Sequence, residues 1–306
     1  MEKISFLDRT LTRWQVGNST FLALPEKGAR LMNWQVALGD GSVRDVIYWP
    51  EMKTLDDLPK VRGGNPILFP FAGRTYDRGE IYFWRDAAGV RRPMPMHGFA
   101  RESDFTVTQL DKRGFTAQLV PGEAALAAYP FDYEFTVTYR FDPLALTCEF
   151  RLANHGREPL PWSAGHHFYF TLPWSEGTTR SDYLIRIPAN RRWRRDAVGQ
   201  IVTVSSLKTE ESLANPELID TGHAELRSNE VVFGEKGRPG DVTMHLGTDK
   251  VPPPDATFVT WTADAASPFY CVEPWMGPAN AAETKIGLHW VQPGNIGTFT
   301  VSASVR

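Results

Sequence analysis

The chain has 306 residues, of which 42% are hydrophobic, 12% aromatic and 23% charged. This balance is typical of a globular protein that is long enough to bury a substantial core. The formal net charge of −3 creates no strong field toward nucleic acid or an anionic membrane, so neither is expected as a partner.

The start of the chain, MEKISFLDRTLTRW, has charges every few residues and lacks the apolar core of a secretory signal. No window approaches 18 consecutive apolar residues. We therefore expect a soluble, cytoplasmic protein.

The predicted elements, taken in chain order, are mostly strands. EMKTLDDLP at 51–59 could form one helical turn. Apolar residues then alternate at 105–107 and at 115–119 on either side of DKRG, which predicts two strands. The same alternation over 131–141 and 144–152, separated by Asp-Pro, predicts a hairpin with both apolar faces on one core.

Helical signal is weak in the second half of the chain. Residues 203–218 could form a helical turn or two before Pro216, whereas 299–305 alternate as a final strand. The 25 glycines and 23 prolines are spread along the chain, as tight turns between short strands require. We predict an all-β protein, a large antiparallel β-sandwich with few short helices, built as a single domain over 1–306.

The two cysteines, Cys148 and Cys271, belong to no Cys-x-x-Cys pair and no Cys/His cluster with zinc spacing. We expect buried thiols and no metal site. The run RRWRRD at 191–196 has four arginines around a tryptophan, but it lies between two strand-like segments of an acidic chain. A solvated loop is the favoured interpretation.

Four blocks combine titratable residues with aromatics and glycine beyond what a strand pattern requires. They are RGGNPILFPFAGR (62–74), HGFAR (97–101), SAGHHFYFTLPW (163–174) and FYCVEPWMGPANA (269–281).

Two of these blocks contain candidate acid/base groups. Adjacent side chains of a strand point to opposite faces, so only one of His166 and His167 can face a ligand. Glu273 follows a strongly apolar run, where a carboxylate is costly unless it is paired or used and where burial would raise its pKa. Among the many aromatics, Trp275 and Tyr169 are the candidates for stacking on a ligand.

In this order and spacing, the four blocks resemble the aldose 1-epimerase (mutarotase) family. The shared pattern is Gly-Gly-x-Pro-x-x-Phe-Pro-x-x-Gly-Arg, His-Gly-Phe-Ala-Arg, Gly-x-His-x-x-Phe-x-Leu and Glu-Pro-Trp-x-Gly-Pro. The resemblance implies a galactose mutarotase-like supersandwich. It also implies interconversion of the α and β anomers of a free aldose by an isomerase that needs no metal or organic cofactor.

The resemblance also implies roles for individual residues. His167 corresponds to the general acid and Glu273 to the general base. His97 and Arg74 correspond to residues that hold the ring oxygen and the neighbouring hydroxyls. Many family members place a sugar-binding aspartate between the second histidine block and the glutamate, and here Asn229 or Glu230 is expected to take that position.

Two alternatives remain open at this point. A mutarotase for a phosphorylated hexose would need extra basic groups, which Arg62, Arg101 or the arginines of 191–195 could provide. A non-catalytic sugar-binding protein on the same fold would not need the acid/base pair. A small-molecule sugar is the expected partner, and the protein is expected to be a monomer or homodimer.

Overall fold

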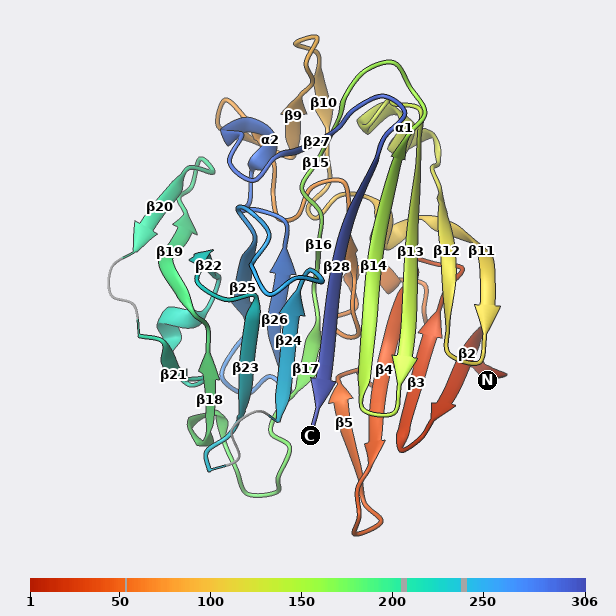
Figure 1. Ribbon diagram of the computed structural model, residues 1–306, viewed down its shortest axis with the longest axis vertical. Coiled ribbons are helices and arrows are strands. Elements are labelled where there is room, and N and C mark those ends of the chain that lie inside the picture. The colour runs from red at the N-terminus through yellow and green to blue at the C-terminus, as the bar shows by residue number, and fades with distance from the viewer. Residues whose placement is uncertain (53, 205–207, 238–240) are drawn as a thin grey trace.

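The computed structural model describes residues 1–52, 54–204, 208–237 and 241–306. Two large antiparallel sheets face each other, and strands from both ends of the chain lie in them (Figure 1). The predicted all-β antiparallel sandwich is confirmed. Among the described helices, none is both long and apolar enough to cross a membrane.

The larger sheet contains 13 strands. In spatial order its main path runs β1 (Glu2–Phe6), β2 (Arg9–Val16), β3 (Ser19–Leu24), β4 (Arg30–Ala37), β5 (Val43–Ile47), β17 (Tyr169–Thr171), β26 (Phe269–Trp275), β25 (Thr257–Trp261), β22 (Thr221–Leu226), β19 (Ala189–Arg195) and β20 (Ile201–Val204). Off this path, β16 (Gly165–His166) pairs with β26 and with β6 (Ile67–Leu68).

The second sheet contains nine strands. Its order is β11 (Asp104–Asp111), β12 (Gly114–Val120), β13 (Tyr133–Asp142), β14 (Ala145–Asn154), β28 (Ile296–Val305), β24 (Val242–Leu246), β23 (Glu230–Glu235), β18 (Tyr183–Arg186) and β21 (Glu210–Ser212). The hairpins predicted at 105–119 and 131–152 and the predicted final strand all belong to this sheet.

Small two-stranded sheets and short helices fill the connections. The sheets pair β7 (Tyr76–Asp77) with β8 (Glu80–Ile81), β9 (Phe83–Arg85) with β10 (Arg91–Pro93), and β15 (Leu160–Trp162) with β27 (His289–Val291). The helices are η1 (Leu58–Lys60), η2 (Ala100–Glu102), α1 (Glu123–Ala128), η3 (Arg180–Asp182), η4 (Pro216–Leu218) and α2 (Ala281–Thr284).

Three sequence expectations about elements need correction or refinement. Residues 203–218 are not helical before Pro216: their described part forms the end of β20, β21 and then η4, and 205–207 lie outside the described residues. Of 51–59, only the end takes part in the single turn η1, and residue 53 lies outside the description. RRWRRD is not a loop, because its arginines and tryptophan form most of β19.

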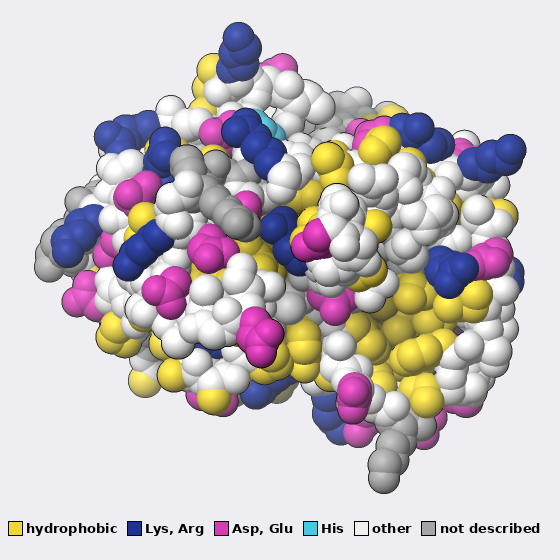
Figure 2. All heavy atoms as spheres, turned by 90° about the horizontal axis from the view of Figure 1, so that it is seen from below, with side chains coloured by type: hydrophobic (Ala, Val, Ile, Leu, Met, Phe, Trp, Pro, Cys, Tyr) yellow, Lys and Arg dark blue, Asp and Glu magenta, His cyan; other side chains and the backbone are white. Residues whose placement is uncertain are grey.

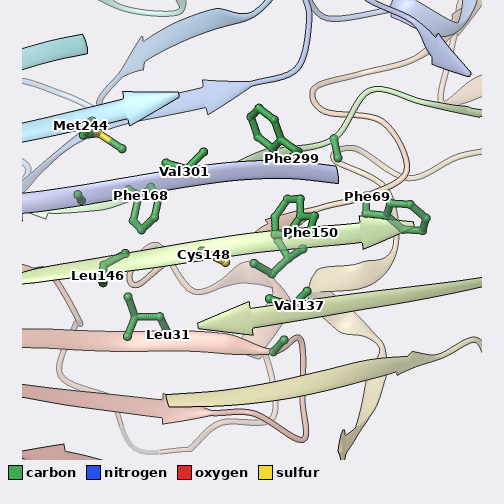
Figure 3. Close-up of a cluster of buried hydrophobic side chains, with 14 of the residues drawn as sticks. Leu31, Phe69, Val137, Leu146, Cys148, Phe150, Phe168, Met244, Phe299 and Val301 are labelled. Atoms are coloured by element: carbon green, nitrogen blue, oxygen red, sulfur yellow. The ribbon is translucent and has the colours of Figure 1, made fainter. Parts of the chain in front are cut away.

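The exterior mixes charges, whereas the interior is apolar. On the face seen in Figure 2, acidic and basic side chains are interspersed. The core lies between the two sheets, where Phe69, Phe150, Phe168 and Phe299 gather (Figure 3). The alternating strands place every second side chain there, which removes apolar surface from water. Both thiols are free and buried, as predicted.

Candidate functional site

A cavity of about 400 Å³ lies against the larger sheet. It is lined by side chains from β17, β19, β25 and β26 and from the segments around β6, η1 and η2. Its polar and aromatic lining consists of Lys60, Arg62, Arg74, His97, Arg101, His167, Tyr169, Arg195, Asp220, Trp261, Glu273 and Trp275. The volume is within the range of small-molecule sites, which are typically about 300–1,000 Å³.

His167 and Glu273 meet in this cavity. His167 Nε2 lies 3.4 Å from Glu273 Oε1, and both residues are buried. Glu273 is on β26, while His167 lies between β16 and β17. The backbone N–H of His167 donates to Asn65 Oδ1 at 3.0 Å. The Nδ2 of the same Asn65 side chain donates to the Tyr139 hydroxyl and to His166 Nδ1. The position of His167 is therefore fixed by a buried hydrogen-bonded network.

The burial of these two groups shifts their pKa values in opposite directions. Burial lowers the pKa of His167 to about 3, and the charges of Arg30 and Arg101 act in the same direction. Burial raises the pKa of Glu273 well above its usual value, and Asp220 adds to the rise. Both shifts favour the uncharged forms. Burial therefore favours a neutral imidazole beside a protonated carboxyl group in the free pair.

The adjacent histidine has a different environment. His166 points into the core, where its ring stacks on Phe150 with centroids 4.2 Å apart and packs near Phe168 and Phe299. Asn65 Nδ2 donates to its Nδ1. The two neighbouring histidines thus point to opposite sides of the sheet, as extended backbone predicts.

His97 is joined to the turn that carries Arg74. Its backbone N–H donates to the Gly73 carbonyl, and the Gly73 N–H donates to His97 Nδ1 at 3.1 Å. The ring therefore carries its proton on Nε2. Burial is the main cause that holds the pKa of His97 well below its usual range, and electrostatic interactions with His167 and the nearby arginines act in the same direction, so this Nε2–H is a neutral donor.

The backbone at His97 is unusual for a non-glycine residue. His97 has φ of 69° and Gly98 has φ of 70°, so two successive residues are left-handed. A Cβ added at Gly98 would lie 2.0 Å from the Phe69 carbonyl oxygen. The HGF sequence thus provides a turn that only glycine fits, and residues held in such conformations concentrate at functional sites.

The predicted aromatic residues also line the cavity. The Tyr169 ring stacks on the His167 ring with centroids 4.6 Å apart and an interplanar angle of 11°. Trp275 meets His97 edge to face at 5.9 Å. Gly165 lies beneath Trp275, where a Cβ would come within 2.6 Å of the indole. The structure therefore brings six predicted residues together: Arg74, His97, His167, Tyr169, Glu273 and Trp275.

Asn229 is not among them, and its assignment as a sugar-binding residue is corrected. It lies beside β23 on the other sheet, where its Nδ2 donates to the carbonyls of Leu246 and Asp249. The alternative, Glu230, is on the surface beside His245. Strand β23 belongs to the nine-stranded sheet, and neither side chain lines the cavity on the larger sheet.

Asp220, Trp261 and Lys60 also line the cavity and were not predicted from the sequence. Arg195, in a run for which a solvated loop was favoured and basic groups for a phosphorylated sugar were the alternative, lines it too. Asp220 directly precedes β22 and lies 3.4 Å from Arg195, which comes from the end of β19. An aspartate located between the histidine and glutamate blocks was a usable signal for Asp220. The strand order that brings β19 and β22 beside β25 and β26 could not be read from local patterns.

Three potential metal-ligand atoms lie close together, two from side chains that line the cavity and one from the buried Cys271 behind it. Ligand atoms of His167, Cys271 and Glu273 lie within 4.8 Å of one another. Burial raises the pKa of both the thiol and the carboxyl group, which disfavours the deprotonated forms that bind metals. The surrounding guanidinium groups further oppose a cation. The donor set is therefore a poor fit for a resident metal ion.

Comparison with known proteins shows the family of this chain. A family model described as aldose 1-epimerase matches residues 12–275. The chromosomal LacX protein of Lactococcus lactis subsp. lactis is 25% identical over 235 residues, which cover 72% of this chain and 76% of that protein.

Solved structures share the fold. A Synechocystis protein is 25% identical with a TM-score of 0.78, covering 100% of this chain and 99% of that one. A galactose mutarotase related enzyme from Lactobacillus acidophilus is 21% identical with a TM-score of 0.75, covering 97% of each chain. A galactose mutarotase-like protein from Clostridium acetobutylicum is 15% identical with a TM-score of 0.78, covering 100% and 98%.

Proposed function

Because this chain belongs to the aldose 1-epimerase family, we propose that it interconverts the α and β anomers of an aldose. The observation that carries the proposal is the buried pair of His167 and Glu273, 3.4 Å apart in a cavity of about 400 Å³. One imidazole and one carboxyl group whose pKa values are shifted in opposite directions can act as a general acid and a general base in paired proton transfer.

The reaction needs two proton transfers and no cofactor. A base removes the proton of the C1 hydroxyl while an acid protonates the ring oxygen, so the bond between C1 and the ring oxygen breaks and an aldehyde forms. Rotation about the C1–C2 bond presents the other face of the carbonyl. The roles then reverse, the ring closes and both protons return. Each such transfer commonly contributes about 10²–10⁴-fold.

Glu273 as base and His167 as acid are the roles that we propose for ring opening in one direction. In the free pair, burial favours the titratable proton on Glu273 over His167. Each full cycle uses each group once as an acid and once as a base. The reaction therefore requires that the two groups together carry one transferable proton. Substrate binding has to shift that proton to His167 for this assignment to begin the cycle.

The other predicted residues have supporting roles in this proposal. The Nε2–H of His97 and the guanidinium of Arg74 would stabilise negative charge that develops on a sugar oxygen. Trp275 and Tyr169 offer aromatic faces for the C–H face of the ring. Asp220, which lines the cavity where Asn229 does not, is the proposed partner of the sugar hydroxyls.

A small-molecule sugar is thus the proposed partner. The sequence resemblance favours a free hexose or pentose.

Polarimetry tests the proposal. Freshly dissolved α-glucose and α-galactose, and their phosphorylated counterparts, should reach their equilibrium rotation faster with the protein than without it. Acceleration with at least one aldose is expected. No acceleration with any free or phosphorylated aldose would refute the enzyme and leave a sugar-binding protein.

A further inference from the structure

The fourth sequence block ends in Gly-Pro-Ala-Asn at 277–280, a part that the proposed chemistry does not use. Its last residue, Asn280, is buried but does not line the cavity. The backbone there is left-handed, with φ of 60°, directly before α2. Apart from glycine, asparagine is one of the few residues that adopt this conformation. A strained backbone and a buried amide thus coincide at one position, and both need a reason.

The side chain of Asn280 joins three segments of the chain. Its Oδ1 accepts a hydrogen bond from the backbone N–H of Tyr76 at 2.9 Å. Its Nδ2 donates to the Gly199 carbonyl at 3.3 Å and to Glu283 Oε2 at 2.8 Å. Glu283 Oε1 in turn accepts from the backbone N–H of Arg78 at 2.8 Å. The segment 76–78, the turn between β19 and β20 and the helix α2 are therefore held by one buried polar network.

Two of these segments carry arginines of the cavity. Arg74 lies two residues before Tyr76, and Arg195 ends β19 four residues before Gly199. Both arginines line the cavity. A single buried amide therefore connects the backbone next to Arg74 with the hairpin that carries Arg195.

Two glycines let these segments pack closely. Gly73 has φ of 78° and Gly199 has φ of 84°. A Cβ added at Gly73 would lie 2.9 Å from the Cβ of Ala279, the residue before Asn280. A Cβ added at Gly199 would lie 2.3 Å from the Tyr76 ring. Each turn thus lies directly against its neighbour, and the hydrogen bonds of Asn280 hold the two in register.

The turn at Gly73 supports both groups that are proposed to stabilise charge on a sugar oxygen. Arg74 follows Gly73, and Arg74 Nε is buried without a hydrogen-bond partner among the described residues. The position of Arg74 therefore depends on its backbone. His97 exchanges two hydrogen bonds with the same Gly73. A misplacement of about 1 Å can cost about 10²-fold in rate, so the position of this turn matters.

We propose that Asn280 is a positioning residue for the anomer exchange, because its amide fixes the turn from which Arg74 reaches the sugar. This inference rests on the proposed function. Asn280 does not line the cavity, so it acts through Arg74 and not by contact with the substrate. Its loss should weaken transition-state stabilisation while the pair of His167 and Glu273 stays in place on the other side of the cavity lining.

Asn280→Gly tests the proposal, since glycine removes the amide without adding strain to the left-handed backbone. The kcat/KM for an accepted aldose should fall at least tenfold. Asn154→Ala is the matched control. Asn154 is equally buried, and its amide also makes three hydrogen bonds to backbone, but it ends β14 on the nine-stranded sheet. N154A should lose stability in denaturant titration while its kcat/KM stays within twofold of wild type.

A double-mutant cycle separates positioning from a general loss of structure. In a protein that already carries Arg74→Gln, Asn280→Gly should change kcat/KM less than threefold, because the group that it positions is gone. Glu283→Ala, which removes a half-buried partner of Asn280, provides a milder variant that should fold normally and lower kcat/KM at least threefold.

The outcomes distinguish the two claims. A tenfold loss from N280G in both backgrounds, or wild-type kcat/KM in E283A and in folded N280G, would overturn the positioning role and leave the proposed function standing. A wild-type protein that accelerates the exchange of no aldose would refute the proposed function and with it the inference that rests on it.

Discussion

At the scale of single residues, the pair of His167 and Glu273 is the centre of the proposed chemistry. Each group alone would be unfavourable in a buried site if it were charged. Together they hold one proton, which is what both halves of an anomer exchange require. The core position of His166, stacked between phenylalanines, explains why only the second histidine of the block can reach a ligand.

Substitution of the pair should separate chemistry from folding. Glu273→Gln and His167→Ala should each lower the rate of anomer exchange by about 10²–10⁴-fold because one proton-transfer group is lost. Circular dichroism should show an intact fold. His166→Ala is the matched control: it should lower the unfolding temperature through lost core packing while keeping most activity. An inactive H166A beside an active H167A would contradict the assignment.

The pH dependence should follow the shifted pKa values. Below about pH 3 the His167 imidazole gains a proton and no base remains, since burial holds its pKa at about 3. At high pH the carboxyl group of Glu273 loses its proton and activity should fall. Because the pKa of Glu273 is raised, this fall should occur at a higher pH than the usual range of a carboxyl group. We expect a plateau of kcat/KM across neutral pH, because kcat/KM reports the pKa values of the free enzyme. An acid limb near pH 6.5, typical of an exposed imidazole, would contradict this description.

At the scale of elements, period-two alternation predicted the strands that have one face in the core, such as β13 and β28. This alternation did not predict strands whose successive side chains are not alternately buried and exposed. In β19, Arg192 and Trp193 are buried side by side while Arg195 faces the cavity, so no alternation marks the strand. Short helices such as η1 and η2 depend on tertiary contacts that local propensity does not encode.

The left-handed turn at His97 and Gly98 gives a prediction at this scale. Gly98→Ala should destabilise the protein by at least about 2 kcal/mol, because the conformation is left-handed and the new Cβ would meet the Phe69 backbone. Activity should fall as His97 moves.

Gly39→Ala is the control, since nothing lies within 4 Å of its added Cβ and its φ is not positive. It should change the unfolding free energy by less than about 0.5 kcal/mol. Denaturant titration compares the two, and a G98A protein as stable as G39A would show that the turn is not constrained.

At the scale of the whole molecule, the sequence predicted the sandwich from its alternating apolar residues, and it predicted six residues that line the cavity from four short blocks of titratable, aromatic and glycine residues. It did not predict Asp220, and it included Arg195 only among the candidate basic groups for a phosphorylated sugar while favouring a solvated loop for 191–196. Their positions depend on the order β26, β25, β22, β19 in the larger sheet, and strand order is a long-range property. Asn229 was wrong for the same reason: nearness in sequence to a motif does not decide which sheet a residue joins.

We propose that the chain is a single domain, and unfolding can test this. The N-terminal strand β1 lies in one sheet and the C-terminal strand β28 in the other, and one apolar core lies between them. Tryptophan fluorescence and far-UV circular dichroism should therefore report one coincident transition in denaturant. Two separated transitions would indicate more than one cooperative unit.

The most direct test of the central claim is the rate of anomer exchange at equilibrium, measured by NMR magnetisation transfer between the α and β C1 protons of an accepted aldose. Wild-type protein should accelerate exchange well above the uncatalysed rate in proportion to enzyme concentration, and folded Glu273→Gln at the same concentration should not. Equal exchange rates with wild type and E273Q would contradict the proposed role of the pair.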